Sequence, residues 1–199
     1  MPSPLAHCAL AFAAWPPVRD SVRPQIAPWR RHLLLLMVLG AFVAPDGDIA
    51  LNLLIGRSAF ETHGAAVHSL AAGVPFAILF ALACRVIAPV PFGKMALVGL
   101  LAYWSHVLMD ACTHGRGVAM FWPLWSERVV LPVPLFVGVE HSNWQAWGHH
   151  ALTITTEAAF TAAVWFVCAR WRRSRAPIRR ESPLVGDMGQ GAMERGAME

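Results

Sequence analysis

Long apolar stretches, each with a polar patch at or near one end, constrain the fold of this 199-residue chain most strongly. The four patches are residues 45–48, 63–69, 106–110 and 149–150, and each contains aspartate or histidine. Such side chains are costly inside an apolar segment and are usually functional there, whereas at helix ends the cost is smaller. Whether the patches lie close to one another is therefore more informative about function than the presence of any single patch.

The composition is that of a membrane protein. Hydrophobic residues make up 56% of the chain, charged residues 14%, and the mean hydropathy is +0.48. A soluble domain carries roughly 25% charged residues, and the chain is too short for a second sizeable domain beside a membrane bundle. The arginines behind the net charge of +4 adjoin apolar stretches, where they orient the chain or contact anionic lipid. We therefore expect no nucleic-acid partner.

The apolar pattern predicts an all-α, multi-pass transmembrane helical bundle with about four spans. These spans are expected near residues 32–55, 65–90, 95–112 and 148–169. The first should break at its aspartates, because its uninterrupted apolar run is shorter than the ~20 residues that a span needs. Pro75 is expected to interrupt the second span.

Three units are expected along the chain. They are an N-terminal lead-in over residues 1–31, a membrane-embedded domain over residues 32–169, and a basic, disordered cytoplasmic tail over residues 170–199. Residues 5–15 of the lead-in are apolar but lack the preceding basic residues of a signal peptide. We therefore expect this segment to be untethered or to lie at the membrane interface.

Basic residues cluster before the first span, between the second and third spans, and after the fourth. The positive-inside rule places these segments, and with them both termini, in the cytoplasm. All four polar patches then lie at the opposite, extracytoplasmic face. Because the basic residues alone determine this orientation, the convergence of the patches independently indicates one site built from several helices.

Two of the patches have informative spacings. His106 and Asp110 are four residues apart, so in a helix they share one face. This spacing lets one helix offer two metal ligands, or a ligand and its orienting partner. His63 and His68 are five apart, which is about 140° of rotation on an ideal helix. We expect His63 in the turn before the second span and His68 on its first turns.

The remaining patches allow more than one interpretation. Asp46 and Asp48 flank a glycine and can converge in a turn, but the same residues could merely end the first span. Ser69 could donate to a ligand or satisfy the backbone. His149 and His150 are possible additional site residues at the start of the last span. His7 and His32 are expected on the cytoplasmic side, away from the site.

Taken together, mixed histidine and aspartate ligands at a water-facing edge indicate a divalent metal site. Zinc suits this ligand set best, with manganese or iron less specific alternatives. Such an ion lowers the pKa of bound water and polarises a carbonyl or phosphoryl oxygen, which is hydrolytic chemistry. The predicted metal ligands are Asp48, His68, His106 and Asp110. Asp46 and His63 are predicted to be catalytic or to bind a second metal.

These motifs resemble the YdjM family of inner-membrane proteins, which are described as membrane-bound metal-dependent hydrolases. The family pattern is roughly Pro-Asp-x-Asp, then His-Arg-Gly-x-Thr-His-Ser, then His-x-x-x-Asp followed by Thr and Gly, then Trp-Pro. The resemblance covers about residues 32–126 and implies a bacterial inner-membrane location. The matching motifs here begin at Pro45, His63, His106 and Trp122.

Two residues depart from the family pattern. Gly64 stands where the pattern has arginine, and Val67 where it has threonine. If the arginine of the family holds a phosphate or a carboxylate, this chain has lost or relocated that contact. The departures therefore concern substrate recognition rather than metal ligation.

The predicted function is metal-assisted hydrolysis of an ester or phosphoester at the extracytoplasmic face. A lipid or lipid-linked substrate is expected because the site lies near headgroup depth, while the oligomeric state is not specified by the sequence. One alternative is an ion transporter or metal-binding protein, whose site would lie near the bilayer midplane. Another is a structural or regulatory membrane protein whose polar residues pair only with one another and bind no metal.

Overall fold

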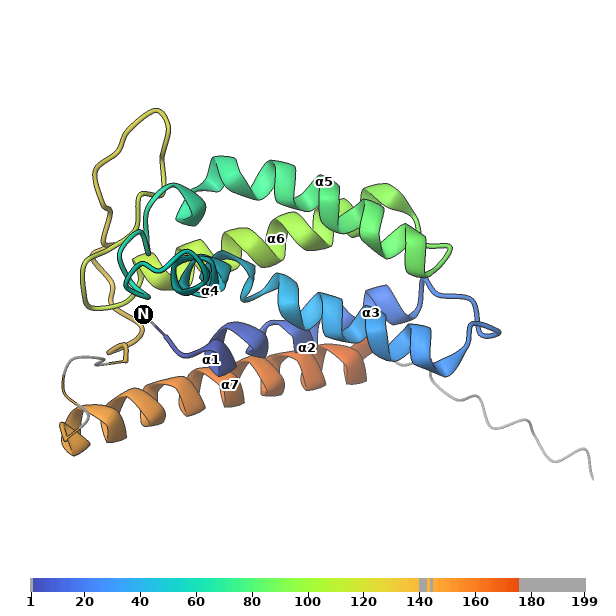
Figure 1. Cartoon of the computed structure of the whole chain (residues 1–199). Helices are drawn as coiled ribbons and strands as arrows, with labels where there is room; N and C mark the ends of the chain where they lie inside the picture. The colour runs from blue at the N-terminus through green and yellow to red at the C-terminus, as the bar shows by residue number, and fades with distance from the viewer. Residues whose placement is uncertain (1, 140–142, 144, 176–199) are drawn as a thin grey trace, which may run out of the picture.

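A computed structural model describes residues 2–139, 143 and 145–175, and its regular elements are all helical. The elements, shown in Figure 1, are α1 (Pro4–Ala9), α2 (Ala11–Arg19), α3 (Pro28–Ala41), η1 (Ala44–Asp46), α4 (Gly47–Leu54), η2 (Ala66–His68), α5 (Leu70–Ile87), α6 (Phe92–Ala111) and α7 (Trp147–Arg175). The described residues contain two isolated β-bridges but no strand. The prediction of an all-α bundle is confirmed.

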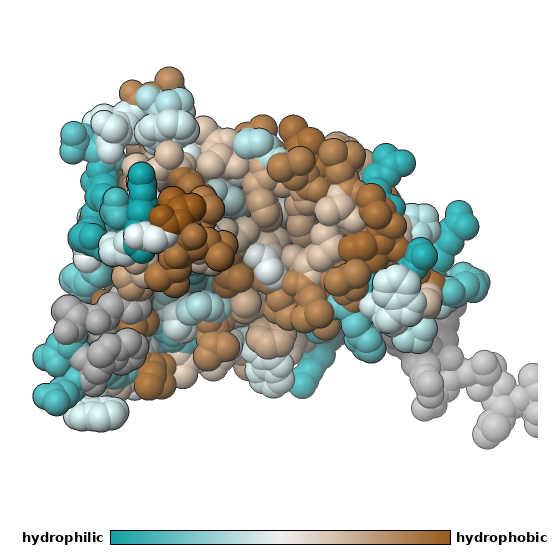
Figure 2. Space-filling view, viewed as in Figure 1, coloured by the Kyte–Doolittle hydropathy of each residue, from teal (hydrophilic) through white to brown (hydrophobic). Residues whose placement is uncertain are grey.

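Three helices, α5, α6 and α7, are long and apolar enough to cross a membrane. A fourth candidate span is the pair formed by α3 and the segment Ala44–Leu54, which is bent by 76°. The bend falls at the predicted polar break, where Pro45 lies in the first turn of η1 and Gly47 opens α4. Figure 2 shows apolar residues across the middle of one face of the bundle and hydrophilic residues toward its two ends.

The antiparallel hairpin of α5 and α6 is the central packing unit. Its helices approach closely at two glycines, because Gly73 faces Trp104 and Gly99 faces Phe80. Small residues allow such close approach between membrane helices. The prediction that Pro75 interrupts the second span is wrong, since α5 runs through it from Leu70 to Ile87. Membrane helices accommodate proline where local adjustments satisfy the carbonyl group that it leaves without a donor.

Helices α1 and α2 lie beside α7 (Figure 1), and Ala6, His7 and Ala9 are buried. A buried carboxylate on α7 holds the start of α1, because the Ser3 amide donates to Glu157 Oε1 at 2.7 Å and the Ser3 hydroxyl donates to Oε2. The prediction that residues 5–15 are untethered is therefore wrong, and a position at the membrane interface stays a prediction. Ala6, Ala9 and Ala11 of this segment are buried in the bundle, whereas Leu5 and Phe12 are exposed.

The first described residues and the end of α7 lie at opposite ends of the bundle (Figure 1). The prediction that both termini are cytoplasmic stays a prediction. Helix α7 continues to Arg175, past the predicted start of the tail at residue 170, and the rest of that tail lies outside the described residues.

Substitution of Gly73 by Ala is expected to lower the thermal unfolding midpoint in detergent. A Cβ at this position would lie 2.8 Å from Trp104 Nε1, and overpacking costs about 1–3 kcal/mol. The control is Gly93→Ala, where a Cβ meets nothing within 4 Å. Equal midpoints for the two variants would contradict the close packing of α5 on α6.

Candidate metal centre

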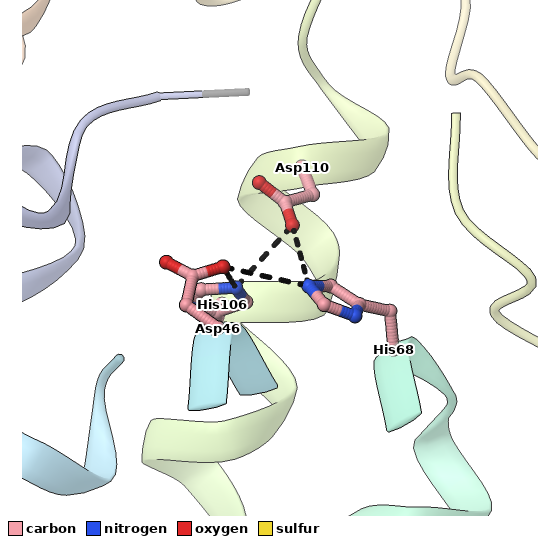
Figure 3. Close-up of side chains that lie close together, drawn as sticks. All are labelled: Asp46, His68, His106 and Asp110. Carbon is pink, nitrogen blue, oxygen red and sulfur yellow. Dashed lines mark ion pairs between the residues drawn. The ribbon is translucent and has the colours of Figure 1, made fainter. Parts of the chain in front are cut away.

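Four ligand side chains from three elements point toward one another at one end of the bundle (Figure 3). Asp46 comes from η1, His68 ends η2, and His106 and Asp110 lie one turn apart on α6. The ligand atoms that they offer all lie within 4.8 Å of one another. The structure therefore brings together three of the four predicted metal ligands and adds Asp46, which was predicted to be catalytic.

The spacing of these atoms fits one tetrahedral cation. His106 Nε2 lies 3.2 Å from Asp46 Oδ1 and 3.3 Å from Asp110 Oδ2. His68 Nε2 lies 3.6 Å and 3.5 Å from the same two oxygens. Zinc binds such nitrogen and oxygen atoms at about 2.0–2.1 Å, and a regular tetrahedron with arms of that length has edges of about 3.3–3.4 Å. Four of the six separations among these atoms are therefore close to those around a tetrahedral zinc ion, and all six are within 4.8 Å.

The same atoms lack hydrogen-bond partners. His68 Nε2, His106 Nε2 and both carboxylate oxygens of Asp110 are buried and make no hydrogen bond within the described part of the chain, and the same holds for Asp46 Oδ1. An unsatisfied buried polar group costs about 1–3 kcal/mol. Several unsatisfied buried groups in one place would together be costly. A cation bound among them explains the arrangement, because bonds to a metal replace the missing hydrogen bonds.

A hydrogen bond determines which nitrogen of His106 faces the cluster. His106 Nδ1 lies 2.8 Å from the carbonyl oxygen of Phe42, which can only accept, so Nδ1 carries the proton. Nε2 then presents a lone pair toward Asp46 and Asp110. Metal-binding histidines are commonly oriented through such a bond on the other ring nitrogen.

Asp48 lies behind the four-atom group and contacts two histidines. Its Oδ1 accepts from His63 Nδ1 at 2.8 Å, and its Oδ2 lies 3.6 Å from His68 Nδ1. Asp48, His63 and His68 form a second group that could hold a metal. The roles predicted for Asp48 and His63 stay predictions, and Asp48 Oδ2 is near His68 Nδ1 without a hydrogen bond between them.

His7 is the site residue that sequence reasoning missed. It lies on α1, is 1% exposed, and its Nε2 is 3.5 Å from Asp110 Oδ1. Its ring stacks on His106 with a centroid distance of 3.8 Å. The prediction that His7 lies away from the site is wrong, because α1 begins at the site end of the bundle rather than at the other end. The available signal was a histidine within an apolar segment.

Contacts from α6 hold His68 in position. The Tyr103 hydroxyl donates to the Val67 carbonyl, and Trp104 Nε1 donates to the Leu70 carbonyl at 2.9 Å. Ser69, a predicted additional site residue, is the N-cap of α5, and its hydroxyl accepts from the Ala72 amide at 3.1 Å. The contact observed for Ser69 is therefore the one that satisfies the backbone.

His149 and His150 belong to neither metal-binding group among the described residues. His149 Nε2 donates to the Gly138 carbonyl at 2.9 Å, and so does the hydroxyl of Thr153 at 2.6 Å. These contacts tie α7 to the segment that follows α6. The roles predicted for the two histidines stay predictions.

A cavity of about 480 Å³ adjoins the cluster. Asp110 and His63 line it on the side of the metal-binding residues, and Arg116, Arg128 and His149 line it elsewhere. Arg128 packs against Gly64, where a Cβ would collide with its guanidinium group. The cluster is thus open to a small molecule on one side although its ligands are buried.

Fold and cluster together define a multi-span membrane protein with a buried His/Asp group that can bind a metal ion. The family model described as YdjM inner membrane protein matches residues 1–176. The chain belongs to this family and is an inner-membrane protein, which confirms the resemblance seen in its motifs. No match was found among curated proteins or among solved structures.

Substitution of His7 by Ala is expected to raise the dissociation constant for zinc about 10–100-fold, the range found when a group that supports metal ligands is removed. Zinc titration of detergent-purified protein against a competing chelator measures this change. His32→Ala is the matched control, because His32 is an exposed histidine on α3. Equal zinc affinities of the two variants would show that His7 does not support the metal site.

Proposed function

We propose that this protein is a membrane-bound, metal-dependent hydrolase that acts on an ester or phosphoester at the membrane face where the cluster lies. The observation that carries the proposal is the concentration, beside an open cavity, of buried histidine and aspartate atoms that make no hydrogen bond within the described residues. Both nitrogens of His68 and both carboxylate oxygens of Asp110 lie at ion-pair distances from their neighbours but make no hydrogen bond within the described residues, which leaves their lone pairs for a cation.

Asp46, His68, His106 and Asp110 would hold the metal, with His7 placed to add a further nitrogen beside Asp110. Two nitrogens and two oxygens at tetrahedral spacing suit zinc, with manganese or iron as alternatives. Such an ion supplies Lewis-acid activation of water and of the substrate's carbonyl or phosphoryl oxygen. Because Asp110 also lines the cavity, a substrate there would reach the centre on its Asp110 side.

The chain's own proton-transfer group in this proposal is His63. It lines the cavity, and Asp48 accepts its Nδ1 proton at 2.8 Å, which sets the ring orientation and directs Nε2 away from Asp48. A histidine held by a carboxylate can take a proton from attacking water and return it to the leaving group. Asp46, the other residue predicted to be catalytic, instead contributes its Oδ1 to the four-atom group.

A lipid or lipid-linked substrate is consistent with the surroundings. Helix α4 follows Asp46 directly and exposes Leu51, Leu53 and Leu54 at 57%, 61% and 83%. Several large side chains of the segment after α6 are also exposed, among them Trp122 and Trp125. Apolar and tryptophan side chains next to a polar site are typical of the membrane interface.

Ion transport is the alternative function, and the position of the cluster argues against it. His68 directly precedes the cap of α5, and Asp110 is the penultimate residue of α6. The ligands therefore lie at the ends of the spanning helices, whereas transporter sites lie near the bilayer midplane, between discontinuous helices.

Metal analysis of detergent-purified protein tests the first half of the proposal. About one metal per chain, or two if the group of Asp48, His63 and His68 is also filled, is expected in the wild type. The variants His68→Ala and Asp110→Ala should lose it, because each removes a ligand from the four-atom group. Wild-type protein that stays metal-free after zinc or manganese is added back would overturn the proposal.

Substitution of His63 by Ala tests the proton-transfer step. We expect kcat for a chromogenic phosphoester or ester to fall about 10²–10⁴-fold, the usual contribution of a general acid–base group. Metal retained in the four-atom group should stay near the wild-type level, since His63 lies outside that group. An unchanged kcat in this variant would assign His63 a structural role only.

A further inference from the structure

The cavity beside the metal-binding residues has a basic wall. Arg116 and Arg128 both line it, and Asp110, already assigned to the metal centre, is the single acidic residue among the described residues that line it. Arg116 and Arg128 lie in two different segments. The isolated bridge between Val118 and Val129 pairs these segments with each other. A cavity lined by metal-binding residues and by two arginines favours an anionic ligand.

Two backbone carbonyl groups hold the Arg128 guanidinium in position. Its Nη1 donates to the Gly117 carbonyl at 3.0 Å, and its Nη2 donates to the His63 carbonyl at 2.8 Å. A guanidinium has more N–H groups than these two bonds use. The residue therefore binds the carbonyl of the proton-transfer histidine while further donors remain for a ligand in the cavity.

Glycine at two positions makes this arrangement possible. Gly64 has a φ of +78°, and any Cβ there would occupy the place of the Arg128 guanidinium. Gly117 has a φ of +68°, and a Cβ there would lie 2.5 Å from the Val129 carbonyl oxygen. Both glycines admit a close approach that a side chain would prevent, and Gly64 stands where the family pattern has arginine.

The two arginines also interact with each other. Desolvation by partial burial, and then repulsion from Arg116, lower the pKa of the Arg128 guanidinium. Both residues lie in the segment that follows α6, outside the spanning helices. Two cations that line one cavity are stabilised when an anion binds to both.

We propose that Arg128, together with Arg116, forms an anion subsite for the phosphate group of the substrate, next to the metal centre. This inference rests on the proposed hydrolase function and narrows its substrate class to phosphate-bearing molecules. Arg128 donates to the non-reacting phosphoryl oxygens and so orients the group toward Asp110 and His63. The phosphate belongs either to a lipid headgroup or to a soluble phosphoester, since both present the same oxygens.

Calorimetric titration of the full-length protein in detergent tests the subsite, with inorganic phosphate as the probe and zinc content measured on the same samples. Arg128→Gln is expected to weaken phosphate binding about tenfold or more, because charge-assisted hydrogen bonds are lost. Arg128→Lys should bind with intermediate affinity, since it keeps the charge but not the fork. Zinc content should equal that of the wild type in both.

Arg57→Gln is the matched control, because Arg57 pairs with Glu61 at 3.8 Å and does not line the cavity. Gly64→Ala is a second, independent variant and should also weaken phosphate binding, since its Cβ displaces the guanidinium. Phosphate binding at wild-type affinity by Arg128→Gln, with zinc retained, would overturn the subsite and leave the hydrolase proposal intact. A wild type without zinc would overturn the hydrolase proposal instead.

Short-chain phosphatidic acid below its micelle concentration separates the two sources of phosphate. Binding that is tighter than that of inorganic phosphate, and that weakens in Arg128→Gln, supports the subsite with a lipid headgroup as its ligand. Equal binding of the two probes, again sensitive to Arg128, supports the subsite with a soluble phosphoester as its ligand. Binding of neither probe to zinc-loaded wild type would overturn the subsite.

Discussion

Burial of the four ligand atoms is the constraint on which the rest of the structure depends. His68, His106 and Asp110 are 0–2% exposed, and their inward-facing atoms are not hydrogen-bonded within the described residues. Carboxylates and imidazoles removed from water in this way are costly unless an ion or a partner satisfies them. The helices around them therefore serve two purposes, since they exclude water from the ligands and hold them at the spacing of a metal ion.

Contacts made outside the four-atom group support that spacing. The close approach of α5 and α6 at Gly73 and Gly99 brings the start of one helix beside the end of the other. The Phe42 carbonyl orients His106 from α3's C-terminal cap. Glu157 on α7 holds α1, which carries His7. Helices without ligands in the four-atom group thus position those that have them, as expected of a pre-organised centre.

Much of this arrangement could be predicted from the residues. The break at Asp46 and Asp48, the shared helix face of His106 and Asp110, and the helical class all follow from local patterns, because periodicity and span length are local properties. Two predictions failed for the same physical reason. The role of His7 and the course of residues 5–15 depend on contacts with α7, more than a hundred residues away, which no local pattern contains.

By itself, the sequence determined the class of the protein, the position of the spanning helices and the side chains that can bind a metal, since hydropathy and ligand chemistry belong to the residues themselves. Only the tertiary structure decided which aspartate joins His106 and Asp110 in the four-atom group. Asp46 ends η1 and Asp48 lies in the first turn of α4, and at the 76° bend Asp46 joins the four-atom group while Asp48 contacts His63 and His68. It also placed Arg128 over Gly64, because distant segments meet only when the chain folds.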